Sequence, residues 1–251
     1  MIRLSGKRAL VTGGSRGIGA ATVRMLAECG ADVVLGYRSR REDAERVAAE
    51  LRTLGVRAAA VAADISTPAG ADALVAEAVR AVGALDLFVG NAGIWPVEDE
   101  EVTRLSDARW RRTMAQNVDA MFYSTRAAAR VLRDHGRIVL VASTAGQRGE
   151  AFHSDYGASK GAMIAFVKSL APELARRDIT VNSVAPGWVD TEMCEIPYAD
   201  GGRARIEATI PLGRVADPKD IAGPIAFLCS DLARHITGEI VNVNGGSVLC
   251  G

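Results

Sequence analysis

Two side chains one helical turn apart, Tyr156 and Lys160, are suited to moving a proton. They occupy positions i and i+4 of a predicted helix, so they share one face about 5–6 Å apart. A free tyrosine has a pKa near 10, and an adjacent ammonium stabilises the phenolate and lowers that pKa. With four lysines in the chain, this spacing is uncommon by chance. The pair therefore fits the delivery of a proton to a developing alkoxide, which hydride transfer to a carbonyl requires.

A second pattern is the glycine-rich turn at residues 13–19 (GGSRGIG), directly after an apolar run at 8–12. Gly13 lets the chain turn off the strand, Gly17 lets a pyrophosphate approach the backbone, and Gly19 lets the following helix pack closely. Free N–H groups at a helix start favour an anion. The GxxxGxG spacing is a variant of the dinucleotide fingerprint GxGxxG, although a purely structural turn also needs glycine. We interpret it as a nucleotide-binding turn.

Strands and helices that would position these residues alternate along the chain. Strands rich in Val, Ile and Leu on both faces are expected at 8–12, 32–36, 56–62, 85–89, 136–141, 179–184 and 239–243. Amphipathic helices are expected at 17–29, 42–54, 69–81, 107–133, 155–176 and 217–229. This alternation predicts one α/β domain over residues 1–251, a Rossmann-like, doubly wound, parallel seven-stranded sheet with helices on both faces.

One stretch, at about 191–211, breaks this alternation by mixing Gly, Pro, Tyr and charged residues. It is either a surface loop or a lid over a substrate. Long irregular segments inside compact domains are more often lids or binding loops than filler, so we expect a substrate lid.

Composition excludes several classes of function. Thirty basic residues balance thirty acidic ones, so no overall field favours nucleic acid or an anionic membrane. The four cysteines form no CxxC pair, and the histidines are scattered, which argues against disulfides and metal sites. No run reaches the roughly 18 apolar residues of a membrane span. The expectation is a soluble, cytoplasmic protein that holds no metal.

Further short motifs follow one another along the chain: residues 12–19 (TGGSRGIG), Asp64-Ile65, 91–93 (NAG), Asn117, Ser143, 156–160 (YGASK) and 186–191 (PGWVDT). In these motifs the sequence resembles the short-chain dehydrogenase/reductase family over nearly its whole length. Within that family, the stretch at 169–193 (SLAPELARRDITVNSVAPGWVDTEM) looks most like the 3-oxoacyl-carrier-protein reductases. Two departures lie outside the catalytic positions: Gly90 precedes Asn91 where many relatives have a second Asn, and Asn244 replaces a common Asp.

The resemblance implies a catalytic tetrad of Asn117, Ser143, Tyr156 and Lys160. Tyr156 would be the general acid–base, and Lys160 would bind the nicotinamide ribose and, together with a nicotinamide cation, lower the Tyr156 pKa. Ser143 would hydrogen-bond the substrate carbonyl oxygen. Asn117 would hold a helix kink and a water in a proton relay, whereas the residues alone suggest a local backbone cap.

It also implies a set of cofactor-binding residues. The phosphates and adenosine ribose would meet the glycine-rich turn, the adenine would meet Asp64, and the nicotinamide would lie beside the 186–191 stretch. Besides Tyr156 and Lys160, the expected cofactor contacts are Gly13, Ser15, Arg16, Gly17, Ile18, Gly19, Tyr37, Arg38, Asp64, Ile65, Asn91, Ala92, Gly93, Pro186, Gly187, Val189 and Thr191.

The end of the second strand indicates which nicotinamide cofactor is used. NAD-specific enzymes of this fold place an acidic residue there, and that carboxylate repels a 2′-phosphate. Here the position falls on Tyr37, followed by Arg38, while Arg16 lies in the glycine-rich turn. Two guanidinium groups would then converge on one phosphate, which predicts NADP(H). The alternative is that Arg38 belongs to a solvated loop.

Three readings of the activity stay open. The first is an NADPH-dependent reductase of 3-oxoacyl thioesters on an acyl carrier protein, in fatty acid biosynthesis; Arg130 is a candidate docking residue, but Pro172 replaces a basic residue common in such enzymes. The second is a reductase of a free ketone, sugar or steroid. The third is a non-catalytic NADP-binding scaffold. Resemblance also implies a homotetramer, formed through the helices at 107–133 and 155–176 and through the tail at 240–251.

Overall fold

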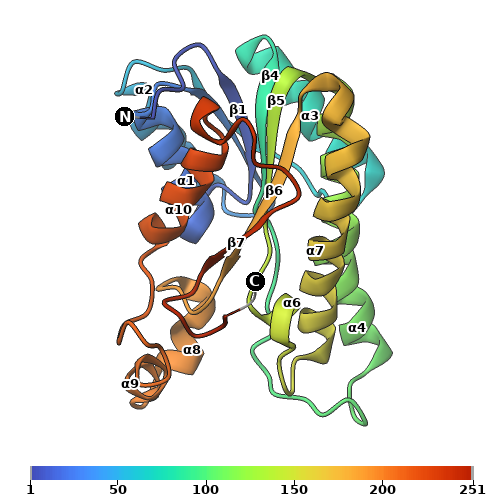
Figure 1. Cartoon of the computed structure of the whole chain (residues 1–251), viewed down its shortest axis with the longest axis vertical. Helices are drawn as coiled ribbons and strands as arrows, with labels where there is room; N and C mark the ends of the chain where they lie inside the picture. The colour runs from blue at the N-terminus through green and yellow to red at the C-terminus, as the bar shows by residue number, and fades with distance from the viewer. Residues whose placement is uncertain (1, 250–251) are drawn as a thin grey trace.

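Seven parallel strands form one sheet in the computed structural model, which describes residues 2–249 (Figure 1). Their spatial order is β3-β2-β1-β4-β5-β6-β7. The strands are β1 (Arg8–Thr12), β2 (Asp32–Tyr37), β3 (Ala58–Ala62), β4 (Leu85–Gly90), β5 (Leu132–Val141), β6 (Thr180–Pro186) and β7 (Ile240–Val243). The order reverses between β1 and β4, which is where doubly wound folds form their ligand crevice.

Helices cover both faces of this sheet. The main ones are α1 (Gly17–Glu28), α2 (Arg41–Arg52), α3 (Pro68–Val82), α4 (Asp107–Met114), α5 (Ala120–Val131), α7 (Ser154–Leu174) and α10 (Pro218–Leu228). In Figure 1, α1 and α10 lie on one side of the sheet, and α3, α4 and α7 lie on the other. None of the helices within residues 2–249 is long and apolar enough to cross a membrane.

Side chains that alternate along the strands divide the core into two layers. Ala9 and Val11 of β1 pack with residues of α1, α2 and α10, whereas Leu10 between them packs with residues of α3, α5 and α7. All three are fully buried. Because successive side chains of a strand point to opposite faces, a strand covered on both sides must be apolar throughout. The predicted doubly wound sheet is confirmed.

Two predicted elements differ from the structure in detail. The helix expected at 107–133 is divided by a π-helical turn, η1 (Ala115–Asp119), and ends at Val131, because Leu132 begins β5. The segment expected to be irregular at 191–211 contains short helical turns: η3 (Glu192–Cys194), α8 (Glu195–Tyr198) and α9 (Gly202–Glu207). The other expected strands and helices lie within a few residues of their predicted bounds.

Candidate active site

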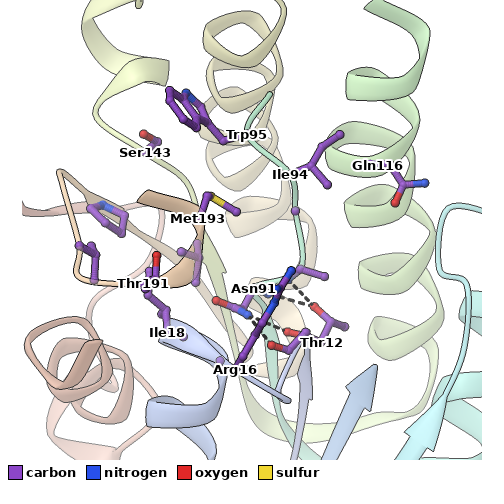
Figure 2. Close-up of a pocket in the computed structure, with 18 of the residues that line it drawn as sticks. Thr12, Arg16, Ile18, Asn91, Ile94, Trp95, Gln116, Ser143, Thr191 and Met193 are labelled. Carbon is purple, nitrogen blue, oxygen red and sulfur yellow. Dashed lines mark hydrogen bonds between the residues drawn. The ribbon is translucent and has the colours of Figure 1, made fainter. Parts of the chain in front are cut away.

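The candidate site is a cleft of about 610 Å³ at the carboxyl edge of the sheet. It is lined by residues that follow the ends of β1 to β6, which come together because all the strands run parallel. Every residue predicted for the site lines this cleft except Asn117, which is fully buried. Figure 2 shows Ser143 and Trp95 toward one end and Arg16 toward the other.

Backbone geometry shapes the glycine-rich turn. Gly13 has a φ of 67°, which favours glycine, and a Cβ on Gly19 would lie 2.1 Å from the Gly13 carbonyl oxygen. The Asn91 side-chain amide donates to the carbonyl oxygens of Thr12 and Gly13, at 3.0 and 3.2 Å (Figure 2). The Thr12 hydroxyl accepts from the backbone N–H groups of Asn91 and Ala92, each at 3.0 Å. Asn91 thus ties the loop after β4 to the turn after β1.

At the start of α1, the geometry fits a bound anion. The N-cap residue Arg16 is extended, no side chain caps the helix, and no acidic residue stands in the first turn. The first N–H groups of a helix then keep their capacity to bind an anion, which the helix dipole favours. A Cβ on Gly17 would lie 3.2 Å from the Thr191 methyl group, so the start of the 191–211 segment approaches this turn closely. These features fit the pyrophosphate of a dinucleotide.

Tyr156, Lys160 and Ser143 meet in the same part of the cleft. Lys160 Nζ donates to the Val141 carbonyl oxygen at 2.8 Å and lies 5.7 Å from the centre of the Tyr156 ring. Burial lowers the pKa of Lys160 to about 8. Burial also raises the pKa of Tyr156; a hydrogen bond with Ser143 opposes this rise and the charge of Glu150 adds to it. The chain's own residues therefore do not produce the lowered Tyr156 pKa expected from the sequence.

Asn117 lies in the π-helical turn η1, behind the wall of the cleft. Its Oδ1 accepts from the Ile94 N–H at 2.8 Å, and its Nδ2 donates to the Ile94 carbonyl oxygen at 2.9 Å and to Ser159 Oγ at 3.0 Å. It therefore does not act as a local backbone cap, since all three contacts reach other elements. Its place in a π-helical turn fits the helix kink that the resemblance implied, and such turns are frequent at functional sites.

The two arginines expected to meet at a 2′-phosphate have different partners in this structure. Arg38 hydrogen-bonds Gln116, while Arg16 pairs with Glu192 at 2.5 Å. Arg40, which the sequence analysis did not select, contacts the same Glu192 oxygen at 2.9 Å. Arg16 and Arg40 therefore converge on one carboxylate oxygen, whereas Arg38 does not share that partner; all three arginines line the cleft. The run of arginines at 38–41 was the available signal, but it does not show which side chain turns inward.

Two tryptophans, Trp95 and Trp188, form an aromatic wall that lines the cleft. Trp95 stacks on His153 at 4.6 Å between ring centres and meets the edge of Trp188 at 6.1 Å. Its indole N–H donates to Glu150 at 3.3 Å, and burial raises the pKa of that carboxyl group. Sequence reasoning missed this group because its members come from separate loops and share no motif.

Comparison with known proteins agrees with this geometry. The family model described as enoyl-(acyl carrier protein) reductase matches residues 13–247. The 3-oxoacyl-[acyl-carrier-protein] reductase FabG of Escherichia coli is 37% identical over 247 residues, covering 98% of both chains. Versicolorin reductase 1 of Aspergillus parasiticus is 38% identical and covers 98% of this chain and 97% of its own. The solved short chain dehydrogenase of Burkholderia cenocepacia, in complex with NADP, has a TM-score of 0.91 at 39% identity and covers 98% and 99%.

The chain belongs to the short-chain dehydrogenase/reductase family. The family predicted from its motifs is therefore confirmed, and the protein is an oxidoreductase of that family. Among residues 2–249, no group of three or more His, Cys, Asp or Glu side chains is placed to hold a metal ion.

Proposed function

We propose that this protein is an NADPH-dependent carbonyl reductase in which Tyr156 is the general acid. The observation that carries the proposal is the meeting of Tyr156, Ser143 and Lys160 in one cleft with the glycine-rich turn. Bound NADPH would supply the hydride to the carbonyl carbon. The Ser143 hydroxyl would orient the carbonyl oxygen, and the Tyr156 hydroxyl would give that oxygen its proton.

Lys160 would serve this proton transfer through its charge. Its ammonium lies beside the Tyr156 ring, so it stabilises the phenolate that forms once the proton has left. Asn117 would act as a positioning residue, because its bonds to Ile94 and Ser159 hold the loop after β4 against α7, which carries Tyr156 and Lys160.

For the cofactor, the proposal is a preference for NADPH over NADH of at least tenfold in kcat/KM. Tyr37 ends β2 without a carboxylate to repel a 2′-phosphate, and Arg16, Arg38 and Arg40 line the cleft nearby. A relative of known structure holds NADP. Each charge-assisted contact is worth about 1.5–3 kcal/mol, so one is enough for a tenfold preference. Steady-state kcat/KM values with NADPH and NADH test this, and equal values would contradict it. The double variant Y37D/R16Q, which adds a carboxylate and removes one guanidinium group, should reverse the preference.

The proposed substrates are 3-oxoacyl thioesters carried on an acyl carrier protein, which would place the enzyme in fatty acid biosynthesis. FabG of E. coli, named for this reaction, is similar over the full length. Arg130 is exposed on α5 and available to an acidic carrier, whereas Pro172 lies within α7 where a second basic residue would help. The test compares a carrier-bound 3-oxoacyl group with its free thioester. Arg130→Glu should raise KM for the carrier-bound form at least threefold and leave KM for the free thioester unchanged.

A second candidate is the reduction of a compact, planar ketone. It is favoured by the aromatic wall, where Trp95, Trp188 and Glu150 line the substrate end of the cleft. A relative of comparable similarity is named a versicolorin reductase. Assays of 3-oxoacyl thioesters and free aromatic ketones under the same conditions separate the candidates: at least a tenfold higher kcat/KM for one class selects it.

For residues 191–211 we propose the role of a substrate lid. Its first turn carries Met193 and Cys194, both of which line the cleft, and the Tyr198 hydroxyl donates to the Val189 carbonyl oxygen at 3.1 Å. Deleting 199–207 and closing the gap with two glycines should raise KM for the ketone at least tenfold while leaving NADPH affinity within threefold.

The proposed assembly is a homotetramer in the cytoplasm. Phe122 of α5 is exposed and contacts Phe166 of α7, so these helices present an aromatic surface at the expected interface. Leu249 in the expected second interface is also exposed, while Cys250 and Gly251 lie outside the described residues. Light scattering should give four times the chain mass, and Phe122→Glu should reduce it; a monomer mass at micromolar concentration would contradict the proposal. Cell fractionation tests the location.

A further inference from the structure

Glu192 joins the 191–211 segment to the adenosine end of the cleft. Its Oε2 accepts from Arg16 at 2.5 Å and from Arg40 at 2.9 Å. Arg16 belongs to the glycine-rich turn and Arg40 to the loop between β2 and α2, so one carboxylate oxygen brings together two distant segments. All three side chains line the cleft.

The guanidinium groups of Arg16 and Arg40 therefore contact the same oxygen atom. Two cations this close repel each other unless an anion lies between them, and Glu192 is that anion. Arg40 also lies 3.5 Å from Asp43 of α2, but Arg16 has no other ion-pair partner among the pairs found in residues 2–249. Two guanidinium groups that donate to one carboxylate oxygen can donate in the same way to a phosphate oxygen.

We propose that Glu192 is an internal competitor for the 2′-phosphate of the cofactor. This inference rests on the proposed use of NADPH. In it, Glu192 occupies the phosphate's place between Arg16 and Arg40, and the phosphate must displace it in order to bind. Glu192 is then a specificity-determining residue that weakens the binding of NADPH without affecting NADH, which has no 2′-phosphate.

The exposure of the three side chains makes this exchange feasible. Arg16, Arg40 and Glu192 each retain about half of their side-chain surface in contact with solvent, at 50%, 50% and 45%. Ion pairs this exposed are individually weak. A phosphate carries about −1.5 to −2 charges and three acceptor oxygens, so it outcompetes a single carboxylate. Glu192 therefore reduces NADPH affinity without abolishing binding.

The test measures dissociation constants of NADPH and NADH by fluorescence titration of the full chain. Glu192→Gln keeps the shape of the side chain and removes its charge. We expect it to tighten NADPH binding about three- to tenfold and to change NADH binding less than twofold. Glu195→Gln is the matched control, since Glu195 is exposed in the same segment and carries the same charge; it should change either affinity less than twofold.

Three results would overturn the inference. They are weaker NADPH binding in Glu192→Gln, an equal gain for NADH, and an equal gain in the Glu195→Gln control. If Glu192 acts through Arg40, Glu192→Gln must improve NADPH affinity less in an Arg40→Gln background than in wild type. An equal improvement in both backgrounds would contradict an action through Arg40. Failure of the proposed function has a different signature: wild-type protein that binds NADPH no better than NADH.

Discussion

The two ends of the cleft are built in different ways. At the cofactor end, backbone geometry sets the shape: Gly13 needs its positive φ, and Gly19 has no room for a Cβ beside the Gly13 carbonyl. At the substrate end, side chains set the shape, with Trp95 and Trp188 meeting from separate loops. Backbone constraints select glycine at fixed spacing, whereas many combinations of side chains can close a wall. The sequence of the cofactor end is therefore tightly constrained, whereas the substrate end admits many combinations of side chains.

Tyr156→Phe should give the largest difference between an effect on catalysis and an effect on cofactor binding. It removes one hydroxyl that hydrogen-bonds Ser143 and leaves the ring in place. We expect kcat to fall 10²–10⁴-fold, because the reaction loses its general acid. The NADPH dissociation constant should stay within twofold, because the hydroxyl acts on the substrate oxygen. Stopped-flow rates and fluorescence titration give the two numbers, and more than a tenth of wild-type kcat would show that Tyr156 is not the acid.

The charge of the buried Lys160 should make the free energy of unfolding depend on pH. Burial lowers its folded-state pKa to about 8, whereas an unfolded lysine titrates near 10.4. Between these values the unfolded chain binds more protons, so stability must rise with pH in that window. The destabilisation is complete below about pH 8 and disappears above about pH 10.4.

The comparison with Lys160→Met isolates this group from all others that titrate. The free energy of unfolding of wild type minus that of the variant should rise by about 3 kcal/mol from pH 7.5 to pH 10.5, since one pKa unit is worth about 1.4 kcal/mol. Urea unfolding at a series of pH values measures it. A difference that stays flat would show that Lys160 is not charged within a buried site.

Gly19→Ala tests whether backbone geometry sets the cofactor end. The added Cβ would lie 2.1 Å from the Gly13 carbonyl oxygen, so the turn must shift. We expect a loss of about 1–3 kcal/mol in the free energy of unfolding, as for other overpacked sites, and at least tenfold weaker NADPH binding. Gly223→Ala in α10 is the control, because nothing lies within 4 Å of its added Cβ. That variant should be more stable by about 0.5–1 kcal/mol. Equal effects in both would refute the argument.

Features set by local residue patterns could be predicted from the sequence, whereas contacts between distant residues could not. The uninterrupted apolar run of Ala9, Leu10 and Val11 predicted a strand covered on both faces, because every residue of such a strand is buried. Ion pairs are different: Glu192 is 176 residues from Arg16 in the chain, and no local pattern links them. Arg38 was expected beside Arg16, but surface arginines in a run are equivalent until the fold directs each one.

Asn117 shows a third situation, in which the residue was found only through the family resemblance. Its partners, the Ile94 backbone and Ser159, come from other elements, and an asparagine within a helix has no local feature that distinguishes this role from a cap. A π-helical turn also has no sequence signature comparable to a glycine at positive φ. Long-range hydrogen bonds therefore limit prediction as much as long-range ion pairs do.

The smallest expected effect comes from Trp188→Ala, which tests whether side chains alone set the substrate end. Trp188 contacts Trp95 on one side and Tyr198 of the 191–211 segment on the other, so its loss opens the wall without altering the glycine-rich turn. We expect the ratio of kcat/KM for a bulky ketone to that for a compact one to rise about three- to tenfold, since differences of one or a few methylene groups in an apolar pocket are worth only about 1–3 kcal/mol. NADPH affinity should stay within twofold.

The control is Leu54→Ala, which truncates an exposed apolar side chain beyond α2 and should leave the ratio of the two kcat/KM values unchanged. If Trp188→Ala instead weakened NADPH binding and left the ratio unchanged, the two ends would not be independent, because the wall would then be shaping the cofactor site as well.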